Sequence, residues 1–348
     1  MSGDRFLVTG ASGNTLIAHC YNADGSLYLP YGTNGRAHVP VSELVLQERR
    51  PAQLIDQAVP DQLADGTAGL PGMGNSPIIS LVAGDKLYLV FSVSWGGTEG
   101  SMSVVVRLDG QGGVDRTFNQ AGYFVVTMAG TDVLTNHPIE AAVQPSANPD
   151  HRAIILLVAE LVGFEQERKF LLCVTDQGLD YGFGQSALLP GYVLVPESSG
   201  FAATALLSGE GGLRVIGGTG YENNINGVVF GFTAQGAVDP HFNGGQPLLT
   251  PSENGWTQGS FYGQGEGERM VLLTYLFKDG SKLGLVRLLA DGRRDQDFGE
   301  GGTVAIPYVV SGWGSRSPVR VTSAPARDVL LGFQTDVYWL LGGNVPAP

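Results

Sequence analysis

The sequence predicts an all-β protein, a β-propeller built from four-stranded antiparallel blades. Three observations indicate this fold class. A turn motif occurs five times, short strands follow one another in a constant order between the copies, and 52 of the 348 residues are glycine, about twice the ordinary usage. Abundant glycine with only 15% charged residues fits short strands joined by tight turns and is not typical of a helical bundle.

The repeated motif reads glycine, two residues, aspartate, two residues, an aromatic residue, and then glycine or asparagine. Its five copies occupy residues 24–35, 111–122, 177–187, 235–245 and 291–302. The aromatic residues of successive copies stand 56 to 87 residues apart, which is the spacing of structural repeats. The motif residues, all expected to have structural roles in the turns, are Tyr31, Asp115, Phe118, Asp180, Phe183, Asp239, Phe242, Asp295 and Phe298.

Each motif residue type has a physical reason. Glycine accepts the positive φ that a tight turn requires, and an aspartate side chain can accept hydrogen bonds from the turn that follows it. The aromatic ring is expected to fill the gap between neighbouring elements. The alternative is a calcium site at Asp291, Asp295 and Asp297, although their spacing departs from the EF-hand pattern.

The strands between the motifs keep one order. A more polar strand comes first, then two apolar strands, the motif and a short strand, as in ATALL (203–207), LRVIGG (213–218), VVFGF (228–232) and QPLLT (246–250). We expect the polar strand to be innermost and AIILLVAEL (153–161) and MVLLTYL (270–276) to lie one step outward. About 22 strands give six blades, with five as the alternative, in a single domain over 1–348.

The motif, the short strand after it and the spacing near 60 residues resemble the delta-60 repeat family of bacterial proteins. The resemblance covers residues 5–310 and implies a propeller-like array. The copies depart from the family pattern in places, because Tyr28 and Tyr31 replace aspartate and phenylalanine, Asn119 replaces glycine, and the third copy is one residue short. The family has no shared catalytic set, so the resemblance implies a fold and no chemistry.

The string LVTGASGNTLI (7–17) resembles the glycine-rich loop of short-chain dehydrogenases. Gly10 and Gly13 fit that loop, which places a pyrophosphate at a helix N-terminus, but Leu16 stands where a third glycine belongs. The chain then continues as TLIAHCY into the turn at 24–25. We therefore expect a β-hairpin and no cofactor.

Other residues with chemical potential are scattered. The five histidines have no metal-ligand spacing, and Cys20 and Cys173 lie inside apolar strands, where we expect buried free thiols. Whether the protein is an enzyme stays open. A propeller hydrolase or lyase with an axial metal is the alternative function, and it rests on analogy with other propellers.

The net charge of −13 disfavours nucleic acid as a partner, because the phosphate backbone is also negative. The sequence shows no classical signal peptide and no apolar run of the ~18 residues that span a bilayer. We therefore expect no membrane partner, and either a cytoplasmic location or export by a leaderless route.

In an antiparallel meander, successive connections alternate between two faces. The connections opposite the motif turns carry a set of aromatic residues, which we call the aromatic loop face: Trp95, Phe164, Phe201, Tyr221, Trp256 and Trp313. Exposed aromatics on a rigid scaffold favour a non-enzymatic protein that binds a protein or glycan partner. The alternative is that each ring caps its own blade. The same face holds a long insertion (42–76), interpreted either as a solvated excursion with a short helix near 51–59 or as a lid or docking loop.

Overall fold

A computed structural model describes most of the chain and divides it into two compact units, residues 1–181 and 182–348. The units are treated one at a time, and the single domain over 1–348 stays a prediction. The described residues are 5–42, 44, 72–73, 78–94, 101–127, 136–144, 153–162, 166–184, 189–196, 201–219, 226–250, 255–262, 268–276, 282–309, 320–323, 329–332 and 337–340.

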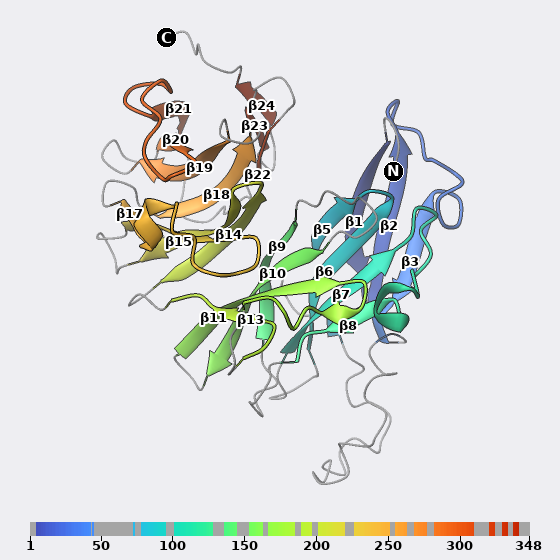
Figure 1. The fold of residues 1–348 in the computed structure, drawn as a ribbon. Coiled ribbons are helices and arrows are strands. Elements are labelled where there is room, and N and C mark those ends of the chain that lie inside the picture. Colours follow the sequence, from blue (N-terminus) through green and yellow to red (C-terminus); the bar gives the residue numbers. More distant parts are fainter. Residues whose placement is uncertain are drawn as a thin grey trace. The chain divides into compact units, whose positions relative to one another are not determined.

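The first unit consists of antiparallel sheets that follow one another along the chain (Figure 1). The first sheet is β1 (Arg5–Ser12), β2 (Thr15–Asn22) and β3 (Arg36–Pro40). The second is β5 (Ile79–Ala83), β6 (Lys86–Ser94), β7 (Ser101–Leu108) and β8 (Tyr123–Val125), with β4 (Gly72–Met73) also paired to β6. The third contains β9 (Asn136–Val143), β10 (Ile154–Val162), β11 (Gln166–Thr175) and β12 (Gly178–Leu179).

The second unit begins within the third motif and contains the short strand β13 (Tyr192–Leu194). Its first sheet is β14 (Ala202–Gly209), β15 (Gly212–Thr219), β16 (Asn226–Phe232) and β17 (Leu248–Thr250). The next is β18 (Trp256–Tyr262), β19 (Arg269–Leu276), β20 (Lys282–Leu289) and β21 (Thr303–Val309). The last is β22 (Arg320–Ser323), β23 (Val329–Gly332) and β24 (Val337–Leu340).

Separate four-stranded antiparallel sheets in chain order are the blades of a β-propeller, so the predicted fold class is confirmed. The only described helices outside residues 41–44 are single 3₁₀ turns, η2 (Phe118–Gln120) and η3 (Asn243–Gly245). None of the helices in the described part of the chain is long and apolar enough to span a membrane. The number of blades stays a prediction.

The predicted strand order within each sheet is also confirmed. The polar strands β9, β14, β18 and β22 each form one edge of their sheet, and the apolar strands β10 and β19 come second. Within the second unit β18 contacts both β14 and β22, and within the first β5 contacts β9, as innermost strands of adjacent blades do. The strand β9 is longer than expected, because it begins at Asn136 and therefore includes His137.

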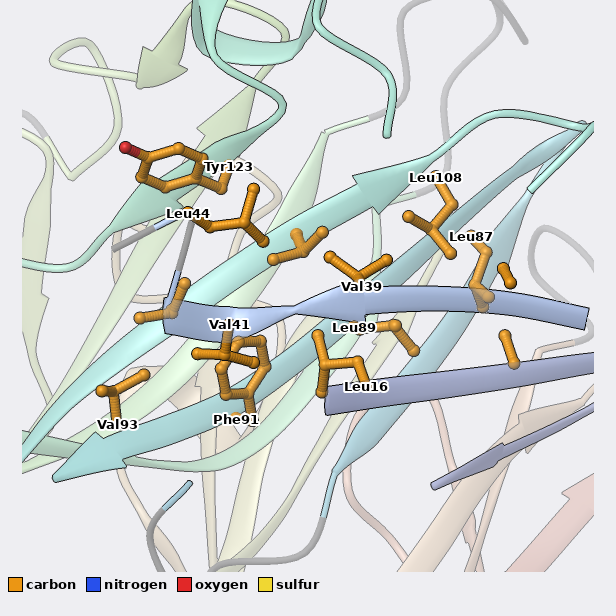
Figure 2. Close-up of a cluster of buried hydrophobic side chains, with 14 of the residues drawn as sticks. Leu16, Val39, Val41, Leu44, Leu87, Leu89, Phe91, Val93, Leu108 and Tyr123 are labelled. Atoms are coloured by element: carbon orange, nitrogen blue, oxygen red, sulfur yellow. The ribbon is translucent and has the colours of Figure 1, made fainter. Parts of the chain in front are cut away.

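The hydrophobic core of the first unit lies between its first and second sheets. Strand β2 alternates half-buried and buried residues, with Leu16, Ala18 and Cys20 all pointing inward, as the two-residue period of a strand requires. Figure 2 shows side chains of the first sheet, such as Val39, next to Leu89 of β6. This packing fixes the two sheets against each other.

The segment 7–17 forms the predicted β-hairpin. Strands β1 and β2 pair from Arg5 with Asn22 to Ser12 with Thr15, and the turn places Gly13 at φ 56°, a left-handed conformation that favours glycine. No helix follows Gly13, so the dinucleotide-loop geometry is absent there. Of the insertion 42–76 the structure describes only residues 42, 44, 72 and 73, so both interpretations of it fall outside the described residues.

Candidate functional site

The motif turns share one backbone arrangement. The N–H group of each motif aspartate donates to a carbonyl of the third strand of its sheet, as in Asp115 to Arg107 (2.9 Å) and Asp239 to Gly231 (3.0 Å). The aspartate side chain accepts from the backbone two residues later, for example Asp239 Oδ1 from His241 N (3.0 Å). Asp115 and Asp295 do the same with residues 117 and 297. These carboxylates therefore shape the turns.

The second oxygen of these aspartates faces a buried arginine. Arg214 Nη2 lies 2.8 Å from Asp239 Oδ2, and Arg107 Nε lies 3.0 Å from Asp115 Oδ2. Both guanidinium groups also lie over the motif ring, that of Arg214 at 4.4 Å from the centre of Phe242. Aspartate, arginine and aromatic ring thus form one packed unit, in which a cation–π contact adds to the ion pair.

The fifth motif repeats this unit with two arginines. Arg287 Nε and Arg269 Nε lie 2.9 and 3.1 Å from Asp295 Oδ2, and Arg287 covers the ring of Phe298 at 4.6 Å. Because Asp295 is engaged by two cations and by the turn backbone, it is poorly placed to ligate calcium. Among the described residues no three histidine, cysteine or acidic side chains are grouped closely enough to hold a metal ion.

The electrostatics of the second motif show how strongly the unit holds its charge. Burial alone would raise the pKa of Asp115. Hydrogen bonds from Thr117 and Lys86, together with the charge of Arg107, outweigh burial and lower this pKa to about 2. The carboxylate is therefore ionised at every pH at which a general acid would need its proton.

The two cysteines occupy the position that holds an arginine in other sheets. The strand residue whose carbonyl accepts from the motif is Arg107 in the second sheet, Cys20 of β2 in the first and Cys173 in the third. Both thiols are buried and free, as predicted. Burial, followed by the charge of Asp180, raises the pKa of Cys173 to about 12. These are core thiols with little nucleophilic character.

Successive motif turns are joined by a repeated contact, which we call the latch. The residue after each aromatic donates its N–H to a carbonyl at the start of the next motif, at 2.6 to 3.0 Å. The donor and acceptor pairs are Gly32 with Gln111, Asn119 with Asp176, Gly184 with Gln235, and Asn243 with Asp291.

The aromatic ring completes the latch at three junctions by packing on the glycine of the next motif. A Cβ added to Gly236, at φ 82°, would lie 2.8 Å from the ring of Phe183. The corresponding distances are 3.0 Å for Gly112 beneath Tyr31 and for Gly292 beneath Phe242. At Gly178 the nearest neighbour is instead the Asn119 side chain, at 2.8 Å. The motif glycine is thus required for its φ and for the close approach of the preceding turn.

Two carboxylates add further links between sheets. Asp176, which directly precedes the third motif, receives a short hydrogen bond from Arg107, whose own sheet carries the second motif. In the second unit Glu268, which is 3% exposed, accepts from Glu210 N (2.9 Å) and Gly211 N (2.8 Å) in the turn between β14 and β15. The motif side of each unit is therefore cross-linked by buried charge.

Two of the six residues of the aromatic loop face are described, and both are buried. Trp256 is fully buried and Phe201 is 6% exposed, so the expectation that they project from loops is wrong. Gly255, at φ 80°, precedes Trp256, whose ring packs against Gly227 at the start of β16. Phe201 stacks edge-on against Phe230 at 4.9 Å. Phe201 fits the alternative interpretation, that each ring caps its own blade, whereas Trp256 packs on the preceding sheet.

The remaining four residues of the aromatic loop face lie outside the described residues, and their binding role stays a prediction. They are Trp95, Phe164, Tyr221 and Trp313.

A charged cluster lies at the start of β9, beside the paired ends of β10 and β11. The fully buried Glu160 is bound by Arg168, with Nε at 3.0 Å. Next to it Glu167 lies 3.0 Å from Lys169 Nζ and 3.4 Å from His137 Nε2. Sequence reasoning missed this cluster, because only the strand register brings its residues together. Its charges pair with one another and therefore contribute to the fold.

A groove in the second unit lies between β17 and the fifth motif turn, with a volume of about 360 Å³. Its apolar lining includes Leu248, Leu249 and Leu288, and two consecutive arginines, Arg293 and Arg294, belong to its other wall. Leu249 is 58% exposed although it belongs to a strand. No feature of the sequence indicates this groove, because its lining residues come from two different sheets.

No family model matches the chain, and no curated protein matches it. Among solved structures, the C-terminal domain of PilY1 from Pseudomonas aeruginosa is 10% identical, with a TM-score of 0.38 over 96% of this chain and 82% of that one. The arabinanase Arb43A from Bacillus subtilis is 11% identical, with a TM-score of 0.32 over 76% and 92%. Likenesses at this level carry no argument about function.

Proposed function

We propose that the chain is a non-enzymatic repeat scaffold that binds a protein or glycan partner through loops carried by its sheets. The observation that supports this is the engagement of the motif carboxylates. Asp115, Asp239 and Asp295 are each bound to the turn backbone and to at least one arginine. A repeated element built in this way stiffens the frame and leaves its carboxylates unsuited to acid–base work.

On a stiff frame, recognition falls to the connections that differ from sheet to sheet. The aromatic loop face keeps four candidates for this role: Trp95, Phe164, Tyr221 and Trp313. Phe201 and Trp256 leave the candidate set because they are buried. The same two residues provide the matched structural controls for testing the other four.

The test compares two alanine variants of the full chain. Replacing Trp95 and Trp313 together by alanine should abolish binding on a glycan array, or binding to a partner protein. The melting temperature should change by only a few degrees. Trp256→Ala should instead lower the melting temperature by about 10 °C, because removing a buried tryptophan costs about 3–5 kcal/mol.

Two results would overturn the proposal. Unchanged binding in the double variant would show that the aromatic loop face does not bind the partner. Stoichiometric calcium or zinc in protein purified without chelator, with hydrolytic activity that depends on it, would favour the alternative of an axial-metal hydrolase or lyase.

A further inference from the structure

The groove beside β17 has the properties of a binding surface and stands apart from the aromatic loop face. We propose that it binds an extended acidic peptide of a partner protein, in which aliphatic side chains alternate with aspartate or glutamate. Four features of the groove support this: an open strand edge, an apolar floor, two arginines and rigid walls.

The first of these features is the open edge of strand β17. In the described part of the chain, strand β17 is the last strand of its sheet and pairs with β16 alone, through Leu248 with Val229, Leu249 with Val228 and Thr250 with Gly227. Its other edge therefore presents backbone donors and acceptors to an incoming chain. An extended peptide that pairs with such an edge gains main-chain hydrogen bonds and places alternate side chains on each face.

The floor of the groove is apolar. Leu248, Leu249 and Leu288 line it, and Leu249 is 58% exposed although it belongs to a strand. An aliphatic side chain of a peptide would bury apolar surface there.

The charge of the groove selects the ligand. Arg293 and Arg294 line it in a chain that carries only 20 lysines and arginines and a net charge of −13. The Arg293 side chain is 77% exposed, and its Nε forms an ion pair with Asp291 (2.6 Å), while its two Nη groups carry further donors. Arg294 Nη1 donates to Thr303 Oγ1 (2.8 Å), which holds this side chain in place. Carboxylates bind guanidinium groups through charge-assisted hydrogen bonds, so an acidic side chain beside an aliphatic one matches this wall. A polyanion such as nucleic acid would meet the repulsion of the rest of the surface.

Both walls are held in place before any ligand arrives. The Asn243 side chain donates to the carbonyls of Gln246 (3.1 Å) and Pro247 (3.0 Å), which fixes the approach to β17. On the other side Arg293 N donates to Asp291 Oδ1 (3.0 Å), and Asn243 N donates to the carbonyl of Asp291 (3.0 Å). A preformed groove binds a short peptide without first ordering itself.

The experiment uses an array of seven-residue peptides with leucine, isoleucine or valine at three alternate positions. The two positions between them carry aspartate, glutamate, serine or lysine. The most strongly bound acidic peptide is then measured in solution by fluorescence anisotropy with the full chain. We expect acidic peptides to bind at least about tenfold more tightly than their lysine counterparts. Methylation of alternate backbone nitrogens should abolish binding, because it removes the strand pairing.

Two pairs of variants locate the site. Arg294→Val introduces the residue type that the fourth motif has at this place, Val238, and Leu249→Ser removes the exposed apolar side chain. Each should weaken the acidic peptide about tenfold or more. The controls are Arg116→Val on the exposed surface of the second motif and Leu194→Ser on β13, which is 45% exposed, and these should bind as the parent does.

The proposal is overturned if no array peptide binds, if lysine peptides bind as well as acidic ones, or if the control variants lose binding equally. The double alanine variant at Trp95 and Trp313 should retain the peptide. If only that variant lost the peptide, the binding site would be the aromatic loop face and not the groove.

Discussion

The first and fourth motif copies make the same backbone turn and differ in what surrounds it. In the fourth, Asp239 is bound to Arg214 and the motif glycine, Gly236, lies beneath Phe183. In the first, Tyr28 replaces the aspartate, and a Cβ on the equivalent glycine, Gly25, would meet nothing within 4 Å. The turn therefore does not depend on the ion pair, and we infer that pair and latch serve to hold neighbouring elements together.

The largest effect we expect is from removing the buried arginine of the fourth motif. Arg214 is 2% exposed, and Arg214→Met would leave Asp239 buried without its cation, at a cost of about 3–5 kcal/mol in the free energy of unfolding. Arg5, which lies over Tyr28 at 4.3 Å in the first sheet, is the matched control. Arg5→Met should cost less than about 1 kcal/mol. Urea titration measures both.

A second variant separates loss of charge from loss of packing. Adding Asp239→Asn to Arg214→Met removes the unpaired carboxylate and should restore part of the lost stability. If the double variant is as unstable as the sum of the single ones, the two residues do not act as a pair and the comparison between the motifs fails.

Acid should weaken the second motif through Asp115. The pKa of Asp115 is about 2 in the folded chain and 3.8 ordinarily, so its contribution is present above pH 4 and is lost as the pH falls toward 2. The loss amounts to about 2 kcal/mol. Urea titrations between pH 5 and 2 on the parent and on Asp115→Asn measure it. A variant that loses stability with acid as steeply as the parent does would contradict the assignment.

The cysteines of the first and third sheets should give the smallest effect, on reactivity alone. Cys20 and Cys173 are buried, and burial raises the pKa of both thiols. An aromatic disulfide reagent at pH 8 should label neither in the native protein and two thiols after denaturation. Rapid labelling of the native protein would show that the two thiols are accessible to the reagent. The cysteines would then not be core residues that stand in place of the buried arginines.

The sequence predicted the turn motif and the strand order because both depend on local spacing. The arginines were missed, although a signal exists: Arg107 and Arg287 each stand eight residues before their motif aspartate, as Gly231 does before Asp239. In that sheet the guanidinium comes from Arg214, the partner of Gly231 across the strands. Arg214 thus takes the role of Arg107 and Arg287 from the neighbouring strand. This equivalence can be recognised only when the strand register is known.

The burial of Trp256 likewise depends on a contact with a residue that is distant in the sequence. A tryptophan after glycine and a loop is equally compatible with a surface ring and with an inward one. What decides is Gly227, whose missing side chain provides the space in which the indole lies. That contact joins residues 29 positions apart in sequence, at adjacent sheets of one unit. The groove beside β17 was unpredictable for a related reason, since its lining residues come from two different sheets.

The central claim is that the motif glycine is required because the preceding turn packs on it. The most direct test compares Gly236→Ala with Gly25→Ala, because φ is 82° at one and 83° at the other. Both variants carry the same backbone strain, about 1 kcal/mol. Only the Cβ at 236 meets neighbours, the Phe183 ring and the Val193 side chain, each at 2.8 Å, and this contact should add about 1–3 kcal/mol of overpacking. Equal losses of unfolding free energy in the two variants would contradict the latch.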